Sequence, residues 1–332
     1  MPHIVRRHTS RPYPTRNRQP SGKPRDKVLS STHFSTGSSL DRRGSTDLGT
    51  IYSHSRLSSF ENCPKQFEFR YVLKIPSESE SIEAFVGKRV HEILERLYQF
   101  VERGQIPGVE KVVDRYQKLW EETYDGERVR IVREGTPLSF YRELGEQCLR
   151  GYYVRHYPFD EDETLGIEKR VIFPLDDAGE YRMQGVIDRI SRARDGSIEV
   201  HDYKTGARVP SQKMLDQDRQ LALYQIGLAR EYGEDVPFRL VWHYVAKNQT
   251  RTSTRTPEQL IALRSSTIER IDEIQRATDF PPRKTALCNW CEYKARCPLF
   301  STADPKPSSP SEAPSTTSGP KSASPSGQLD LL

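Results

Sequence analysis

The feature that most constrains this fold is a change of hydrophobic period near residue 160. Before it, apolar residues recur at helical spacing, and after it they alternate with polar residues as in strands. The predicted helices cover 82–102, 109–124, 138–157, 216–232 and 257–277, and the predicted strands cover 167–173, 181–190, 198–203 and 238–245. Three helices followed by a strand meander, and then by alternating helix and strand, predict an α/β fold in which helices flank a mixed sheet.

The two ends of the chain differ from its middle in composition. Residues 1–50 hold ten Lys and Arg against three Asp, with many Ser, Thr and Pro and few apolar residues. Residues 301–332 consist mostly of Ser, Pro, Ala, Thr and Lys. Neither segment has enough apolar surface to offset the entropy cost of folding. The composition therefore predicts a disordered basic N-terminal arm (1–50), one folded domain (51–300) and a disordered tail (301–332).

The N-terminal arm carries the positive charge of the chain. The whole sequence has a formal net charge of +5, whereas the arm alone contributes +7, ten Lys and Arg less three Asp, so the folded domain is close to neutral. A basic arm of this kind predicts loose, salt-dependent attraction to phosphate backbones. The alternative is a solvated leader without a function.

Several classes of protein are excluded by what the sequence lacks. No apolar run approaches the roughly 20 residues that cross a bilayer, and no signal-peptide core is present. Five cysteines, an odd number in a long chain, do not fit a secreted disulfide framework. There is no GxxxxGK[ST] or GxGxxG loop to indicate ATP or dinucleotide binding. We expect a cytoplasmic protein, in the bacterial cytosol, without a membrane partner.

Two acids lie near the ends of two predicted strands. Asp188 ends the run GVID at 185–188, and Asp202 opens the run DYKTG at 202–206. Because side chains alternate along a strand, Asp202 and Lys204 point to the same face. A carboxylate that can hold a divalent cation then lies beside an ammonium group that can steer water or a phosphate. This arrangement suits the hydrolysis of a phosphodiester.

A divalent metal ion makes this hydrolysis feasible because it shields the phosphate charge and lowers the pKa of bound water. Mg²⁺ prefers oxygen ligands and keeps several waters, so two or three protein groups are sufficient. Asp188 and Asp202 are the natural pair of ligands. His91, on the predicted helix 82–102, could add a nitrogen that favours Mn²⁺, although an ordinary partly buried histidine is the alternative. The backbone carbonyl of Tyr203 could complete the set, and Lys204 would position the attacking water or stabilise charge on the phosphate.

The folded domain contains four motifs in a fixed order. They are GxxxHxxxE at 87–95, GxxD at 185–188, DxK at 202–204 and QxxxY at 220–224. This series resembles the PD-(D/E)xK nuclease superfamily, and specifically its RecB-type exonuclease branch, over essentially the whole folded domain. The resemblance implies a restriction-endonuclease-like core in which His91, Asp188 and Asp202 bind Mg²⁺ or Mn²⁺. It also implies that Lys204 assists the attacking water.

The same resemblance gives a role to the helix that carries Gln220 and Tyr224. In the family this helix lines the active site and contacts the nucleic-acid backbone, which implies the same for these two side chains. Glu168 lies twenty residues before Asp188, near the start of the preceding strand. It could approach the metal as a further ligand, but an exposed strand glutamate is the simpler interpretation.

Cysteines occur near both ends of the folded domain. Cys288, Cys291 and Cys297 form C-x2-C-x5-C, and Cys63 lies in a predicted helix that starts with Ser58 as its N-cap. Four thiolates suit either tetrahedral Zn²⁺ or an iron–sulfur cubane. The arrangement is similar to the iron–sulfur staple of some RecB-type nucleases, including AddB-type proteins. That similarity implies a 4Fe-4S cluster that joins the N- and C-terminal segments, with zinc as the alternative.

The chain ends in a possible docking peptide, Gln328–Leu332. It is similar to the short peptides with which bacterial DNA-processing proteins bind the sliding clamp, although those usually end in Leu-Phe. A chance match is the alternative. The position at the tip of a long polar tail would suit such a contact.

The motifs together predict a metal-dependent DNA nuclease. The resemblance alone implies a single-strand-preferring exonuclease of DNA repair or recombination. Two alternatives remain: a CRISPR-adaptation nuclease of the same branch, and a non-catalytic DNA-binding or helicase-partner subunit. Because no motor motif is present, any unwinding would come from a helicase in trans.

Overall fold

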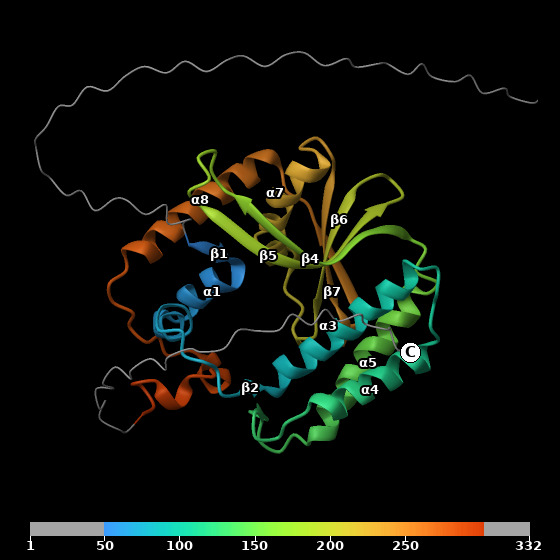
Figure 1. Ribbon diagram of the computed structural model, residues 1–332, viewed down its shortest axis with the longest axis horizontal. Helices are drawn as coiled ribbons and strands as arrows, with labels where there is room; N and C mark the ends of the chain where they lie inside the picture. Colours follow the sequence, from blue (N-terminus) through green and yellow to red (C-terminus); the bar gives the residue numbers. More distant parts are fainter. Residues whose placement is uncertain (1–49, 302–332) are drawn as a thin grey trace, which may run out of the picture. The chain divides into compact units, whose positions relative to one another are not determined.

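The structure is a computed structural model in which residues 50–301 are described (Figure 1). The helices are α1 (His54–Asn62), α2 (Pro64–Phe67), α3 (Ile82–Val101), α4 (Val109–Thr123), α5 (Leu138–His156), α6 (Gln212–Leu215), α7 (Gln220–Tyr232) and α8 (Pro257–Arg276). The shorter turns are η1 (Glu68–Val72), η2 (Val245–Lys247), η3 (Ala286–Trp290) and η4 (Lys294–Arg296). The strands are β1 (Ile51–Ser53), β2 (Glu80–Ser81), β3 (Val129–Arg130), β4 (Asp162–Pro174), β5 (Arg182–Ala193), β6 (Ile198–Lys204), β7 (Phe238–Tyr244) and β8 (Gln249–Ser253). The predicted change of hydrophobic period near residue 160 corresponds in this structure to the change from the helices α3 to α5 to the strands of the sheet.

Strand β5 is the centre of the six-stranded mixed sheet. β4 pairs with one edge of β5 in antiparallel register along its whole length. On the other edge, β1 pairs in parallel with residues 182–184, and β6 pairs in antiparallel register with residues 189–192. The sheet continues from β6 to the parallel strand β7 and then to the antiparallel strand β8. None of the described strands pairs with residues 185–188 on that second edge, so the sheet is open there.

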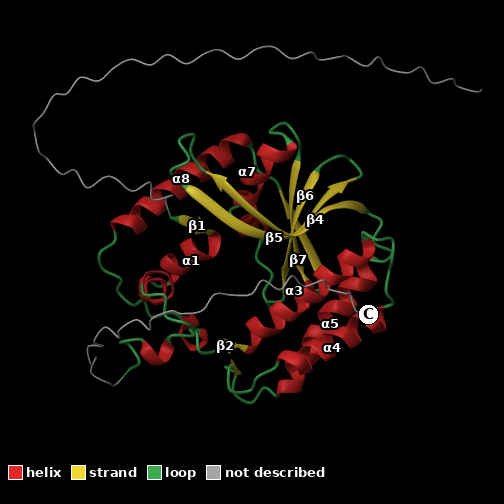
Figure 2. Ribbon diagram, in the orientation of Figure 1, coloured by secondary structure: helices red, strands yellow, loops and turns green. Residues whose placement is uncertain are grey.

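Two buried cores lie on opposite faces of the sheet, and Figure 2 shows the helices that cover them. Ile198 and Val200 of β6 belong to the core under α1, α7 and α8. Tyr203 belongs to the core formed with α3, α4 and α5. Because side chains alternate along β6, Asp202 faces α7 and Tyr203 faces α3. The predicted mixed sheet flanked by helices is confirmed.

The first helix begins earlier than the sequence pattern predicts. Ser53, and not Ser58, is the N-cap of α1, since its side chain accepts a hydrogen bond from the N–H of Arg56 at 3.1 Å. Ser58 lies inside the helix, where its hydroxyl is 3.3 Å from Nε2 of His54. The prediction of Ser58 as the cap is therefore wrong. The sequence pattern misses the true start of the helix because β1, which ends at Ser53, has only three residues and too little alternation to be detected.

Two boundaries in the sheet region also differ from the prediction. β4 begins at Asp162, five residues before the predicted strand, and α7 begins at Gln220 after the separate short helix α6. The strand is thus longer than predicted and the helix starts four residues later than predicted, but the type of each element was predicted correctly. The predicted helix 257–277 does begin at Pro257, whose fixed φ and missing N–H suit the first position of α8.

Some of the predicted features lie outside the described residues. These are the basic N-terminal arm up to residue 49, the tail from residue 302 and the proposed docking peptide Gln328–Leu332. Within residues 50–301, no helix is both long and apolar enough to cross a membrane.

Candidate active site

The site lies where β5 and β6 separate. Their ladder ends at the pair of Arg189 and His201, one residue before the two acids would face each other. Beyond that point the carboxylate of Asp188 replaces the ladder, because its Oδ2 accepts a hydrogen bond from the backbone N–H of Tyr203 at 2.8 Å. The open edge of β5 thus leaves room for polar groups at the centre of the sheet.

His91 comes to this opening from α3. The helix approaches the loop after β6 closely, since a Cβ added to Gly87 would lie 3.1 Å from Oγ1 of Thr205. One turn further on, Nε2 of His91 lies 2.7 Å from the carbonyl oxygen of Tyr203, and Nδ1 lies 3.4 Å from Oδ2 of Asp188. Burial alone would lower the pKa of His91, but the neighbouring Asp188 carboxylate outweighs burial and raises it to about 9.

Glu168 completes this group, although the sequence pattern favoured an exposed side chain. Its neighbours Ile167 and Lys169 pair with Arg189 and Ile187, so Glu168 lies opposite Asp188. Its backbone is left-handed, with a φ of 46°, a conformation that costs a non-glycine residue of the order of 1 kcal/mol. The side chain is half-buried, and burial together with the Asp188 charge raises the pKa of Glu168 to about 7.

His91, Glu168 and Asp188 could together hold a metal ion. Each offers one ligand atom, and these three atoms lie within 4.8 Å of one another. One nitrogen and two carboxylate oxygens fit Mg²⁺ or Mn²⁺, with the nitrogen favouring Mn²⁺. A positive ion would also offset the mutual repulsion of the two carboxylates, which is part of the reason why the pKa of Glu168 is raised.

Asp202 lies outside this group of three, on the side of β6 that faces α7, in a triangle with Lys204 and Gln220. The ammonium of Lys204 lies 3.0 Å from Oδ1 and 2.8 Å from Oδ2 of Asp202. The side-chain amide of Gln220 donates to Oδ1 of Asp202 at 2.9 Å, while its oxygen accepts from Lys204 at 3.0 Å. Each of the three groups therefore contacts the other two.

The environment of Asp202 leaves one of its oxygens without a well-oriented donor. The side chain is only 4% exposed, and burial raises the pKa of Asp202 to about 6 despite the opposing charge of Lys204. Oδ2 is buried and, although it is ion-paired with Lys204, receives no hydrogen bond of normal geometry from any described residue. A buried acceptor of this kind fits a further contact with a cation or a water molecule.

Tyr224 supports the site from α7 by packing on the backbone of β5. A Cβ added to Gly185 would lie only 2.1 Å from the ring of Tyr224, so glycine is required for this approach. Tyr224 is 7% exposed, and burial raises its pKa to about 12. The motifs GxxD and QxxxY are thus complementary, because the first provides the space that the second fills.

The side chain of Tyr203 anchors the peptide that contacts His91 and Asp188. Its hydroxyl lies 3.3 Å from that of Tyr152, which in turn lies 2.7 Å from that of Tyr98. The guanidinium of Arg189 lies over the Tyr98 ring, 4.3 Å from its centroid. This buried network fixes the Tyr203 side chain in the core under α3, α4 and α5, and so fixes the Tyr203 peptide.

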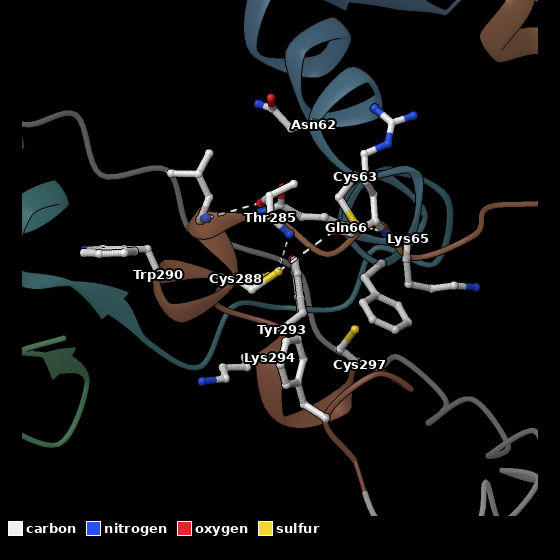
Figure 3. Close-up of a pocket in the computed structure, with 15 residues that line it drawn as sticks. Asn62, Cys63, Lys65, Gln66, Thr285, Cys288, Trp290, Tyr293, Lys294 and Cys297 are labelled. Carbon is white, nitrogen blue, oxygen red and sulfur yellow. Dashed lines mark hydrogen bonds between the residues drawn. The ribbon is translucent and has the colours of Figure 1, made fainter.

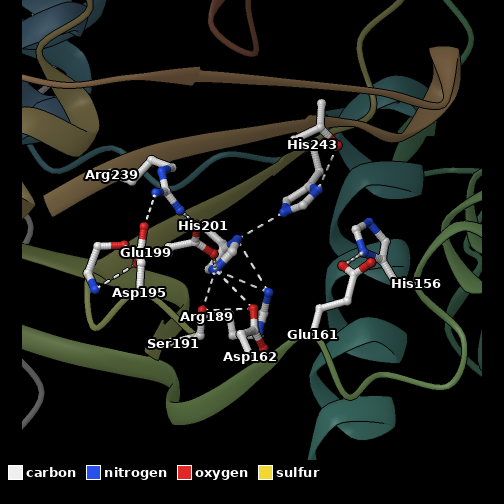
Figure 4. Close-up of polar contacts among 12 residues, drawn as sticks. His156, Glu161, Asp162, Arg189, Ser191, Asp195, Glu199, His201, Arg239 and His243 are labelled. Carbon is white, nitrogen blue, oxygen red and sulfur yellow. Dashed lines mark hydrogen bonds and ion pairs between the residues drawn. The ribbon is translucent and has the colours of Figure 1, made fainter. Parts of the chain in front are cut away.

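Arg189 also belongs to a second polar cluster, shown in Figure 4. It donates to Asp162 at 2.8 Å and contacts His201, whose Nδ1 lies 3.0 Å from Nε2 of His243. Asp162 and His201, together with Glu199, also bring possible ligand atoms within 4.8 Å of one another. However, Arg189 neutralises Asp162 and Arg239 pairs with Glu199. This cluster is therefore already balanced in charge without a metal ion.

The four cysteines singled out from the sequence line one cavity of about 270 Å³, shown in Figure 3. They are Cys63, Cys288, Cys291 and Cys297. The backbone N–H of Arg283 donates to Sγ of Cys63 at 3.4 Å, and that of Thr285 donates to Sγ of Cys288 at 3.3 Å. Segments more than 200 residues apart in sequence thus meet at this pocket.

The structure brings together most of the residues that the sequence singled out. His91, Asp188 and the Tyr203 carbonyl are in contact, as are Asp202, Lys204 and Gln220. Glu168 was underweighted because a left-handed residue within a strand leaves no signal in the hydrophobic pattern. Its only sequence signal was its position on the strand that precedes the GxxD motif.

The model of the PD-(D/E)XK nuclease superfamily matches residues 51–298. A crystal structure from Eubacterium rectale, described as a candidate exonuclease, shares 14% identity over 82% of this chain and 97% of its own, with a TM-score of 0.44. The crystal structure of SSO0001 shares 14% identity over 74% of this chain and 86% of its own, with a TM-score of 0.33. A search of curated proteins gave no match.

Proposed function

The chain belongs to the PD-(D/E)XK nuclease superfamily, whose members hydrolyse phosphodiester bonds with divalent metal ions, and from this premise we propose that it is a Mg²⁺- or Mn²⁺-dependent deoxyribonuclease. We further propose that it is an exonuclease that prefers single strands and acts in DNA repair or recombination. The observation that carries the proposal is the grouping of His91, Glu168 and Asp188 beside the triangle of Asp202, Lys204 and Gln220.

The chemistry follows from the charges at the site. A bound divalent ion would shield the phosphate and lower the pKa of the attacking water. His91, Asp188 and Asp202 would hold it, and Glu168 is placed to add a further carboxylate. Lys204 is fixed by Asp202 and Gln220, so its ammonium can orient the water or stabilise charge on the phosphate without reorganisation.

An intact polar set argues for catalysis over a non-catalytic binding role. A subunit that only bound DNA would have no need of a buried Asp202 with a raised pKa, since a buried carboxylate costs free energy. The raised pKa values of Asp202 and Glu168 are typical of functional sites. They therefore support the enzyme over the DNA-binding or helicase-partner subunit.

The cysteine pocket supports a 4Fe-4S cluster as part of the same proposal. Cys63, Cys288, Cys291 and Cys297 supply four thiols around one cavity, and backbone N–H groups donate to two of the sulfurs. Around a zinc ion, with Zn–S of about 2.3 Å, the sulfurs would lie about 3.8 Å apart. In the described part of the chain, no three of these sulfurs lie within 4.8 Å of one another. The choice of a cubane over a single zinc ion therefore rests on the resemblance of Cys63 and the C-x2-C-x5-C pattern to an iron–sulfur staple.

The proposed partners follow from the same function. DNA, presented as a single strand, would be the substrate, and a helicase in trans would supply that strand where the DNA is duplex. The sliding clamp would bind Gln328–Leu332 in the tail.

The proposal is tested by digestion of end-labelled DNA. Single- and double-stranded oligonucleotides, labelled at the 5′ or the 3′ end, would be incubated with full-length protein and Mg²⁺, Mn²⁺ or EDTA. The proposal predicts metal-dependent release of short products from one end of the single strand. Internal cleavage of both forms at equal rates would contradict the exonuclease assignment, and equal cleavage in EDTA would contradict the metal requirement.

A further inference from the structure

The end of α1 is fixed by the segment that supplies three of the four cysteines. Cys63 follows α1 directly, and Glu61 is two residues before it. The guanidinium of Arg283, a residue from the far end of the domain, donates to the backbone carbonyl of Glu61. The backbone N–H of Arg283 donates to Sγ of Cys63 at 3.4 Å. The cysteine pocket and the last turn of α1 therefore form one connected unit.

The side chain of Glu61 extends this unit toward α7. Both of its carboxylate oxygens accept hydrogen bonds from Arg219, at 2.7 and 2.6 Å. The same guanidinium donates to Oγ of Ser58 at 3.2 Å. The pair is partly buried, with 22% of the Arg219 side chain and 30% of the Glu61 side chain exposed. A bidentate pair of this kind fixes orientation as well as distance.

Arg219 directly precedes Gln220, the first residue of α7, and the side chains of these two neighbours contact different parts of the molecule. That of Arg219 contacts α1, whereas that of Gln220 contacts Asp202 and Lys204 at 2.9 and 3.0 Å. An unbroken series of contacts therefore runs from the cysteine pocket to the catalytic lysine. Nothing in the hydrolysis itself requires Arg219 or Glu61 to touch the substrate.

We infer that Glu61 and Arg219 are a positioning pair, through which the cysteine pocket fixes the start of α7 and so the placement of Gln220 against Asp202 and Lys204. The inference rests on the proposed function for the meaning of that placement. A displacement of about 1 Å at a catalytic group can reduce the rate about a hundredfold. Loss of the Glu61–Arg219 pair, which would let the start of α7 move, should therefore lower the rate of the chemical step. Binding of nucleic acid should change little.

The test compares four full-length variants with the wild type: Arg219→Ala, Glu61→Ala, the double variant, and Arg270→Ala as the matched control. Arg270 also contacts Glu61, with Nε 3.2 Å from Oε1, but has no connection to Gln220. For a single-stranded oligonucleotide, we expect Arg219→Ala and Glu61→Ala each to lower kcat about tenfold or more. KM should change less than about threefold, the double variant should be no slower than the worse single variant, and Arg270→Ala should stay within about twofold of the wild type.

A second readout separates this inference from the proposed function. Amide hydrogen exchange in residues 220–224, measured without substrate, should be faster in Arg219→Ala and in Cys63→Ser but not in Arg270→Ala. This readout tests the link even if the protein cleaves no DNA. Three results would overturn the inference: unchanged kcat and exchange in Arg219→Ala, an equal loss in Arg270→Ala, or an effect confined to KM, which would place Arg219 on the nucleic acid. Unchanged amide exchange of residues 220–224 in Cys63→Ser would contradict the claim that the cysteine pocket fixes the start of α7.

Discussion

Glu168 is a residue of the proposed metal site whose backbone and charge both cost stability. Its φ of 46° is unfavourable for a side chain with a Cβ, and its carboxylate lies close to that of Asp188. The folded protein therefore holds two acids together that would separate in the unfolded chain. Such strain is expected where a cation is to be bound, because the cation reverses the sign of the local interaction.

The Glu168→Gln variant tests this trade-off. The folded-state pKa of Glu168 is raised from 4.5 to about 7, so the folded state binds the proton more tightly and its stability falls as pH rises from about 4.5 through about 7. We therefore expect Glu168→Gln to raise the Tm of the metal-free protein at pH 8 and to leave it nearly unchanged at pH 4.5. Affinity for Mn²⁺ at pH 8 should fall.

The control for Glu168→Gln is Glu163→Gln, on the exposed part of the same strand. It should change neither the Tm nor the Mn²⁺ affinity beyond experimental error. A lower Tm at pH 8 in Glu168→Gln would show that Glu168 makes a favourable interaction in the absence of metal, and would contradict this account of the residue.

Much of the site could be predicted from residue types and spacing. Asp202 and Lys204 share a face because strand side chains alternate, and His91 lies one turn beyond Gly87 on the face of α3 that approaches β6. The contribution of Glu168 could not be predicted, because left-handed backbone at a non-glycine residue depends on its surroundings rather than on the local pattern. The hydrogen bond from the Tyr203 N–H to Asp188 depends in the same way on where the ladder of β5 and β6 ends.

At the scale of elements, the contact between α7 and β5 determines how close Gln220 of α7 lies to the sheet residues of the site. Gly185 lies under the ring of Tyr224, and Gly227 of α7 leaves similar space for the ring of Phe173 on β4. Each glycine lets an aromatic ring approach the backbone of the opposite element. The helix that carries Gln220 can therefore lie close enough to the sheet for its side chain to reach Asp202.

The Gly185→Ala variant tests this packing. Its new Cβ would lie 2.1 Å from the Tyr224 ring, so the ring or the helix must move. We expect a loss of about 1–3 kcal/mol in the free energy of unfolding, measured by chemical denaturation, together with reduced activity. Gly206→Ala is the control, because its Cβ would meet nothing within 4 Å, and it should leave stability nearly unchanged. Equal stability of the two variants would contradict the packing argument.

At the scale of the whole molecule, the cysteine pocket joins the first and last parts of the folded domain. The loop between Cys63 and Cys288 is longer than 200 residues, and closing such a loop removes much of the entropy of the unfolded chain. A cofactor held there would therefore stabilise the whole domain. The ion pair of Arg70 with Glu292 and the hydrogen bond from Tyr293 to the carbonyl of Ile75 join the same segments.

Replacement of one cysteine tests the cofactor and its structural role. We expect Cys63→Ser, purified under anaerobic conditions, to lose its bound iron and brown colour and to unfold at a markedly lower temperature. Cys148→Ser is the control, since Cys148 is fully buried in the other core and should lose stability while keeping its iron. Wild-type protein that contains zinc and no iron would contradict the cluster assignment.

The fold class was predictable from the change of hydrophobic period, but the topology of the sheet was not. β1 has only three residues, yet it pairs with β5 and, together with β6, leaves residues 185–188 unpaired on one edge. Pairings between distant segments depend on packing across the whole domain rather than on local periodicity. The opening of the sheet that accommodates the site therefore became visible only in the structure.

The most direct test of the central claim measures nucleotide release from a labelled single strand by the wild type, Asp202→Asn and Asp216→Asn. Asp216 is an acid that accepts hydrogen bonds from Ser253 and Gln212 and belongs to neither candidate metal group of the described residues, and it serves as the control. We predict that Asp202→Asn lowers the rate by about a hundredfold or more in Mg²⁺ and in Mn²⁺, while Asp216→Asn stays within about twofold of the wild type. Cleavage by Asp202→Asn at the wild-type rate would contradict the assignment of this site.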